Sequence, residues 1–287
     1  MIFMNYKIGN LKIKNRFFLA PMLEPNDIAF RLLCKSAGCG LTYTGMTSPL
    51  NKKKQILDDK PVLQIFANQD TPLKGISNFI TKCNKKVSGF DLNLGCPSKL
   101  SGRLKHGIFL HKELDAIKNI LKTMRIATKK PITIKLRKSV SALEIAKMAE
   151  KENLIDAIAI HPRTQKQGYS GIPDEKFALK LKKQSKLPII YSGNADEKNA
   201  KQLLEKFDFV MLGRNAIGNP NIFAKLLNNK KRFSFKDYFK LAKKYNLNFR
   251  QIKFQAMNFT KGLKNAKELR REIVLTKNVL ELKKIIS

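Results

Sequence analysis

The sequence contains no tryptophan, three histidines and four cysteines among its 287 residues. The cysteines Cys34, Cys39, Cys83 and Cys96 form no Cys-x-x-Cys pair and no zinc-like cluster with the histidines. This spacing argues against the usual disulfide and zinc frameworks. We therefore expect reduced thiols and no bound metal.

Long apolar runs are also missing. A membrane-spanning helix needs roughly 18 or more uncharged apolar residues in a row, and no such stretch occurs. The segment Met1–Lys7 lacks the apolar core of a signal peptide. We expect no membrane partner and a cytoplasmic location. Nothing in the sequence indicates the oligomeric state, and we favour a monomer.

Acidic residues are scarce. The chain has 57 Lys and Arg against 22 Asp and Glu, a formal net charge of +35. The imbalance is steeper near the end, where residues 228–287 hold 17 Lys and Arg against 4 Asp and Glu. A lysine-rich composition would raise lysine on solvated faces but would not thin out the acids. The charge therefore predicts a polyanionic partner such as a nucleic acid.

Eight short apolar runs typical of β-strands recur through the first 212 residues, and segments of helical periodicity separate most of them. The runs are 17–20, 41–44, 62–66, 90–94, 132–136, 155–160, 188–191 and 207–212. Alternating strands and helices indicate a parallel sheet. Eight strands favour an α/β fold of the closed (β/α)₈ type, a TIM barrel. An open doubly wound sheet usually has a glycine-rich turn after its first strand, and here that strand ends in Ala20-Pro21-Met22.

The pattern changes after Asn228-Asn229, where only helical periodicity remains. We therefore predict two domains. Residues 1–229 form the barrel, and residues 230–287 form a small, basic, all-helical domain.

Polar residues follow the predicted strands, and in a barrel the carboxyl ends of all strands share one mouth. The resulting candidate site comprises Gln64, Asn93, Cys96, Lys135, His161, Arg163, Gly193, Asn194, Gly213 and Arg214. Exposed backbone amides at the glycines after the last two strands, next to an arginine, are typical of a phosphate site. Lys135 lies in an otherwise apolar strand, so its ammonium should face the mouth and meet an anion or a carbonyl oxygen.

The run Asp91-Leu92-Asn93-Leu94-Gly95-Cys96-Pro97 carries the most information about chemistry. It ends an apolar strand with polar groups and a thiol. Gly95 and Pro97 are turn formers, so the backbone leaves the sheet there and can hold the sulfur over a pocket. A cysteine in this position can act as an acid.

Together these motifs closely resemble the tRNA-dihydrouridine synthases, in order and in spacing. The residues that carry the resemblance are Ala20-Pro21-Met22, Phe30-Arg31, Leu63–Phe66, the Asp91–Pro97 run, Ile134–Arg137, His161-x-Arg163-Thr164, Gln167–Gly171, Gly213-Arg214, Lys261-Gly262-Leu263 and Glu268-Leu269-Arg270. The resemblance covers nearly the whole chain, including the basic tail.

The resemblance implies an FMN cofactor across the barrel mouth and NADPH, or NADH, as the reductant. The residues that it implies for FMN are Pro21, Met22, Gln64, Lys135, His161, Gly193, Asn194, Gly213 and Arg214. A uridine flipped out of tRNA would receive hydride at C6 from flavin N5, and Cys96, held as a thiol until then, would protonate C5. Asn93, Lys99, Arg103 and Arg163 would contact the substrate.

Three alternatives stay open. A lysine inside a barrel strand also occurs in Schiff-base aldolases, which would use Lys135. A flavin dehydrogenase acting on a free pyrimidine would share the barrel and the cysteine. The third alternative is a tRNA-binding protein with a degenerate flavin site. It draws support from Leu23-Glu24-Pro25, which replaces the small residue and glycine usual in the family and would reshape the turn beside the flavin.

Overall fold

The computed structural model describes residues 6–24, 26–52 and 55–286. An eight-stranded parallel sheet forms its centre, with the strands in the spatial order β4-β3-β10-β9-β8-β7-β6-β5. Their bounds are β3 Phe17–Leu19, β4 Leu41–Thr42, β5 Val62–Ile65, β6 Gly89–Leu94, β7 Ile132–Arg137, β8 Ala157–His161, β9 Ile189–Tyr191 and β10 Phe209–Leu212. Parallel bridges from Tyr43 to Val62 and from Thr47 to Ile65 join the two ends of this order. The sheet therefore closes into the predicted (β/α)₈ barrel.

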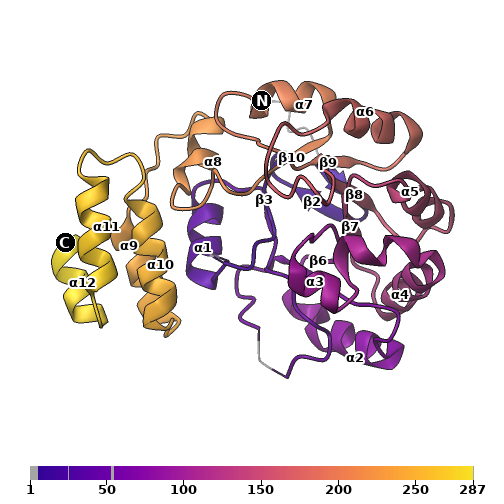
Figure 1. Ribbon diagram of the computed structural model, residues 1–287, viewed down its shortest axis with the longest axis horizontal. Helices are drawn as coiled ribbons and strands as arrows, with labels where there is room; N and C mark the ends of the chain where they lie inside the picture. Colours follow the sequence, from indigo (N-terminus) through magenta and orange to yellow (C-terminus); the bar gives the residue numbers. More distant parts are fainter. Residues whose placement is uncertain (1–5, 25, 53–54, 287) are drawn as a thin grey trace.

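Helices connect the strands and surround the barrel (Figure 1). They are α1 Ile28–Ser36, α2 Leu73–Cys83, α3 Lys99–Arg103, α4 Leu114–Ala127, α5 Ala142–Lys151, α6 Glu175–Gln184, α7 Ala200–Lys206 and α8 Asn221–Leu226, with 3₁₀ helices at Asn84–Lys86 and Gly107–Lys112. All eight predicted strands are present; four start at the predicted residue and four start one or two residues away from it. The run predicted from residue 155 begins at Ala157, because Asp156 instead accepts a hydrogen bond from the Ile132 amide, 2.8 Å away, at the start of β7.

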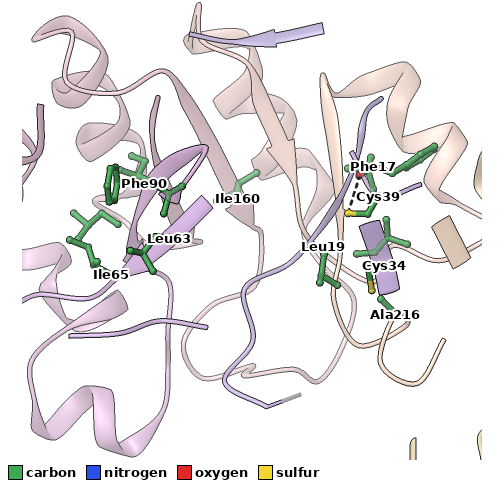
Figure 2. Packing of buried hydrophobic residues seen from close by; sticks show 14 of the residues in the cluster. Phe17, Leu19, Cys34, Cys39, Leu63, Ile65, Phe90, Ile160 and Ala216 are labelled. Carbon is green, nitrogen blue, oxygen red and sulfur yellow. Dashed lines mark hydrogen bonds between the residues drawn. The ribbon is translucent and has the colours of Figure 1, made fainter. Parts of the chain in front are cut away.

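Alternation along the strands divides the core into two layers, since successive side chains point to opposite faces. Phe17, Leu19, Leu63, Ile65 and Phe90 face outward and pack under the helices (Figure 2). The inward-facing positions divide by polarity. Those of β3, β9 and β10, and the first two of β8, are apolar and comprise Phe18, Ala157, Ala159, Ile190, Phe209 and Met211. The last inward-facing position of β8 is His161, which lines the pocket. Those of β5, β6 and β7 include the polar Gln64, Asp91, Asn93, Thr133 and Lys135.

A short antiparallel hairpin precedes the barrel and was not predicted. It consists of β1 Tyr6–Ile8 and β2 Leu11–Ile13. Ile8 and Ile13 are buried and belong to the same apolar cluster as the inward-facing residues Phe18 and Phe209. The hairpin thus covers the end of the barrel from which the strands start.

Four helices follow the barrel and lie together beside α1 and α8 (Figure 1). They are α9 Phe235–Lys244, α10 Phe249–Phe259, α11 Ala266–Leu275 and α12 Val279–Ile286, which we call the helical segment. Buried side chains of this segment, among them Phe235, Tyr238 and Ile252, join one continuous apolar cluster with the outer layer of the barrel. The helical segment is therefore packed directly against the barrel. A division into domains at residue 229 stays a prediction.

Candidate active site

A pocket of about 770 Å³ opens at the carboxyl ends of the barrel strands. The ten residues predicted from the strand ends line it together with Pro21 and Met22, which the resemblance implied: Gln64, Asn93, Cys96, Lys135, His161, Arg163, Gly193, Asn194, Gly213 and Arg214. Lys99 and Arg103 do not line it and lie exposed on α3, directly after the cysteine loop. The structure thus gathers the predicted side chains around one cavity. Their individual roles stay predictions.

A chain of hydrogen bonds lies under one wall of the pocket. Asp91 accepts hydrogen bonds from the Thr133 hydroxyl and from Gln64 Nε2, the latter at 2.7 Å. Gln64 Oε1 in turn accepts one from Asn93 Nδ2 at 2.9 Å. The chain ends at Asn93 Oδ1, which accepts the backbone N–H groups of Gly95 at 3.1 Å and Cys96 at 3.0 Å. The cysteine loop is thereby tied to a buried carboxyl group inside the barrel.

The donors and acceptors along these hydrogen bonds fix the orientation of both side-chain amide groups. A backbone N–H only donates, so the Asn93 atom that faces the loop must be the oxygen. Asn93 therefore turns its NH₂ group toward Gln64, and Gln64 turns its own toward Asp91. Each NH₂ group keeps a second hydrogen, and Gln64 and Asn93 both line the pocket. These two hydrogens can meet carbonyl oxygens of a bound ligand.

Burial shifts the pKa values of two charged groups here. Asp91 is 0% exposed, and burial raises the pKa of its carboxyl from 3.8 to about 7, against the opposing effects of Thr133, Gln64 and Lys135. Burial, together with the charge of Arg137, lowers the pKa of Lys135 from 10.5 to about 8, while Asp91 opposes that shift. The Lys135 ammonium forms no hydrogen bond or ion pair with the described residues, and the side chain lines the pocket. Its ammonium is therefore available to a ligand.

Replacing Asp91 with asparagine is expected to stabilise the protein increasingly as the pH rises. Asparagine can still accept from Gln64 and can donate to Thr133, so the chain of hydrogen bonds survives. In the wild type the unfolded chain loses the Asp91 proton near pH 4 and the folded protein near pH 7, so rising pH disfavours folding across that window. Urea unfolding at pH 5 and pH 8 measures the free energy of unfolding of both proteins. Between these two pH values, the free energy of unfolding of the variant should rise relative to that of the wild type by about 2 kcal/mol. An equal difference at both pH values would contradict this.

The cysteine loop is shaped by close backbone contacts. Gly107 has a φ of +67°, and a Cβ there would lie 2.6 Å from the carbonyl oxygen of Cys96. The Ile108 amide donates to that same oxygen at 3.3 Å. Cys96 is the only one of the four cysteines that is not buried, and its Sγ lies 3.5 Å from Ser98 Oγ. The loop thus holds the thiol at the surface of the pocket, as the sequence predicted.

Arginines surround His161 at the end of β8. The ring nitrogen Nδ1 lies 3.2 Å from Arg137 Nη2, and Nε2 lies 3.0 Å from Arg163 Nη1. Burial and then the nearby charges of Lys135 and the arginines lower the pKa of His161 to about 2, so the ring is neutral. A neutral imidazole accepts only one hydrogen bond, so the other ring nitrogen carries a hydrogen.

Both arginines beside His161 also hold the loop after β8. Arg163 is 1% exposed and donates to the carbonyl oxygens of Ser170 and Gly171. Arg137 donates to those of Thr164 and Gly168. These contacts occupy the guanidinium groups with the chain itself. A direct substrate contact by Arg163 stays a prediction.

The lining of the pocket carries an excess of positive charge. Arg214 donates to Asn194 Oδ1 at 2.9 Å and lies 5.0 Å from the centre of the Tyr169 ring. Four cationic side chains line the pocket, Lys135, Arg137, Arg163 and Arg214, against two acidic ones, Glu24 and Asp196. Its volume lies within the range of about 300–1,000 Å³ that is usual for ligand pockets. The excess of cations and the glycines Gly193 and Gly213 fit a phosphorylated ligand such as FMN.

Among the residues of this site that were not predicted as site residues, four take part in the contacts described above. Arg137 and Tyr169 line the pocket, and Asp91 and Thr133 lie beneath it. Asp91, Thr133 and Arg137 have a recoverable signal, since they alternate with apolar residues and share the inner face with Asn93 and Lys135. Of the unusual turn after β3, Leu23 and Glu24 line the pocket, and Pro25 lies outside the described residues.

Residues 6–24, 26–52 and 55–286 contain no group of three or more His, Cys, Asp or Glu that could hold a metal ion. No helix in the described part of the chain is long and apolar enough to cross a membrane.

Comparison with known proteins places the chain in a family. The model of the dihydrouridine synthase (Dus) family matches residues 18–284. The tRNA-dihydrouridine synthase B of Pasteurella multocida is 31% identical over 238 residues, which cover 76% of this chain and 70% of that protein. A probable tRNA-dihydrouridine synthase of Rickettsia bellii is 32% identical over 238 residues, covering 77% and 73%.

Solved structures resemble the fold. A variant of morphinone reductase in complex with tetrahydroNAD matches with a TM-score of 0.52 at 13% identity, covering 79% of this chain and 90% of that one. A variant of NCR from Zymomonas mobilis matches with a TM-score of 0.54 at 14% identity, covering 83% and 97%. At this identity the likeness concerns the barrel fold alone.

Proposed function

The chain belongs to the dihydrouridine synthase family, whose enzymes reduce uridines in tRNA, and we propose that it does so with FMN as cofactor and NADPH, or alternatively NADH, as reductant. The observation that carries this proposal is the pocket itself. It combines one accessible thiol, a half-buried lysine whose ammonium has no partner among the described residues, and an excess of cations around a cavity of about 770 Å³. We further propose that the enzyme is a cytoplasmic monomer.

The proposed reaction adds a hydride and a proton across the C5–C6 double bond of uracil. FMN, once reduced by NADPH, would supply the hydride from its N5 to C6 of the base. Cys96 gives its Sγ proton to C5 as the general acid, and the thiolate left behind regains a proton from water. The loop held by Asn93 and Gly107 keeps the thiol at this position.

Lys135 and the residues around it bind and orient. Its ammonium would stabilise negative charge near N1 and the C2 carbonyl of a bound flavin ring. Pro21, Met22, Gln64 and His161 would contact the ring, and Asn93 would offer an amide hydrogen to a carbonyl oxygen of the uracil or the flavin. The phosphate would be held by Gly193, Asn194, Gly213 and Arg214, where the Arg214 guanidinium supplies positive charge.

The tRNA contacts lie outside the pocket. A uridine must leave the folded RNA before it can reach the ring, which costs a few kcal/mol. Phosphate contacts offset that cost, and we propose Lys99 and Arg103 on α3 and the basic residues of the helical segment for this purpose. Arg163 lines the pocket, and we propose that it contacts the substrate there. Lys99 and Arg103 are exposed and lie a few residues from Cys96.

The visible absorption spectrum of the purified protein tests this function first. We expect the two bands of an oxidised flavin, loss of both on anaerobic addition of NADPH, and their return when unmodified tRNA is added. Return with free uracil but not with tRNA would favour a dehydrogenase of free pyrimidines. A colourless protein that FMN cannot reconstitute would favour a tRNA-binding protein, or, if borohydride trapped a carbonyl substrate on Lys135, an aldolase.

A further inference from the structure

Helices α9 and α10 contact two loops of the barrel that also line the pocket. We propose that Tyr238, Gln255 and Asn258 are positioning residues, which hold these two loops in place and make the helical segment a supporting layer of the active site. As far as the ligand is FMN, the inference rests on the proposed function. The support of the loops is a property of the free protein and can be tested without a ligand.

The first loop connects β3 to α1. Its residues Pro21–Glu24 line the pocket, and Asp27 ends it as the N-cap of α1, accepting the Phe30 amide at 2.8 Å. The other carboxylate oxygen of Asp27 accepts hydrogen bonds from the helical segment. Gln255 Nε2 donates to it at 3.0 Å and the Tyr238 hydroxyl at 3.3 Å. Asp27 follows Glu24, in the pocket wall, by three positions in the sequence.

This anchor is buried and polar. Tyr238 and Gln255 are 0% exposed and Asp27 is 8% exposed. Burial raises the pKa of Asp27, and Gln255 Oε1 is buried without a hydrogen-bond partner among the described residues. Such an arrangement costs more than an apolar contact of the same size. Packing alone would not require it, whereas fixing the direction of a loop does, because hydrogen bonds are directional and apolar contacts are not.

The second loop follows β10, and its residues Gly213, Arg214, Asn215 and Ile217 line the pocket. Gly218 has a φ of +70°, and a Cβ there would lie 2.2 Å from the backbone oxygen of Asn258 at the end of α10. Lys261 Nζ lies 3.3 Å from the Ile217 carbonyl oxygen. The loop and the helix end therefore meet backbone to backbone, and no side chain fits between them.

The two loops are neighbours, because β3 and β10 pair in the barrel. Helix α10 contacts one loop through Gln255 and the other through Asn258, three residues further along the same helix. Figure 1 shows α10 on the side of the helical segment that faces α1. A single helix outside the barrel thus supports the wall beside the predicted ring site and the loop at the predicted phosphate site.

The test uses the full chain and the double variant Tyr238→Phe/Gln255→Met, which removes both donors to Asp27 while keeping the volume. Lys253→Met is the matched control, because Lys253 lies on the same helix but donates only to Val274 and Thr276 within the helical segment. Hydrogen exchange of the ligand-free proteins would be measured over residues 22–31, with FMN affinity measured by fluorescence titration. A second variant, Gly218→Ala, tests the loop after β10 over residues 213–219.

We expect exchange over residues 22–31 to be about tenfold faster in the double variant and FMN affinity to be about tenfold lower, with both unchanged in the control. Gly218→Ala should give the same pair of effects over residues 213–219. Loop exchange equal to wild type in both variants would overturn the inference. If the variants exchange faster but the wild-type protein does not bind FMN, the result would support the positioning role and contradict the proposed cofactor.

Discussion

Replacing Cys96 with alanine is expected to lower dihydrouridine formation by about 10²- to 10⁴-fold, which is the usual contribution of a positioned general acid. NADPH should still reduce the bound flavin at close to the wild-type rate, because the thiol proton takes no part in that step. Anaerobic stopped-flow absorption measures flavin reduction, and single-turnover assays with unmodified tRNA measure product.

A matched control is Cys83→Ala. Cys83 is a buried cysteine on α2 that does not line the pocket. Its replacement should leave both rates unchanged, apart from any loss of stability. A Cys96→Ala variant that modified tRNA at the wild-type rate would show that another group supplies the proton.

Replacing Lys135 with methionine is expected to slow flavin reduction by NADPH by about 10²-fold or more, by analogy with the loss of one preorganised charge at a reacting centre. Methionine keeps most of the length of the side chain, so the barrel interior stays filled. Stopped-flow reduction at saturating NADPH separates this effect from weaker binding. Lys138→Met is the control, since Lys138 pairs with Asp174 and does not line the pocket.

The pH dependence gives this second prediction a distinct signature. Burial and Arg137 lower the pKa of Lys135 to about 8, so the ammonium is present below that pH and is lost as the pH rises through it. Wild-type flavin reduction should therefore fall above pH 8. The Lys135→Met variant should not show this decrease in rate above pH 8. A variant that still showed it would assign the titration to another group.

Much of the barrel and of the pocket could be predicted from the sequence because both follow from local patterns. Eight apolar runs mark the strands, and closure of the barrel then brings their carboxyl ends together whatever the helices do. Gln64, Asn93, Cys96 and Lys135 stand out because each is a polar residue in or directly after an apolar strand. Their convergence on one cavity needed no further information.

Other features depended on long-range geometry. The β1–β2 hairpin has strands of three residues with an exposed lysine in each, too short to show a pattern. Tyr169 reaches the pocket because Arg137 and Arg163 hold its loop, which no local signal reveals. The anchor at Asp27 joins residues more than 200 positions apart in the chain.

The hairpin over the opposite end of the barrel has a consequence for the order of events. Ile8 and Ile13 cover that end, and Phe18 and Phe209 fill the barrel interior behind it, so the pocket is closed at its floor. A molecule that reaches the floor must enter and leave through the mouth of the pocket. Two reactants that both need to touch the same group are therefore obliged to take turns, and each delays the other while it stays. The hairpin, although far from the reacting groups, thus requires the two reactants to bind one after the other.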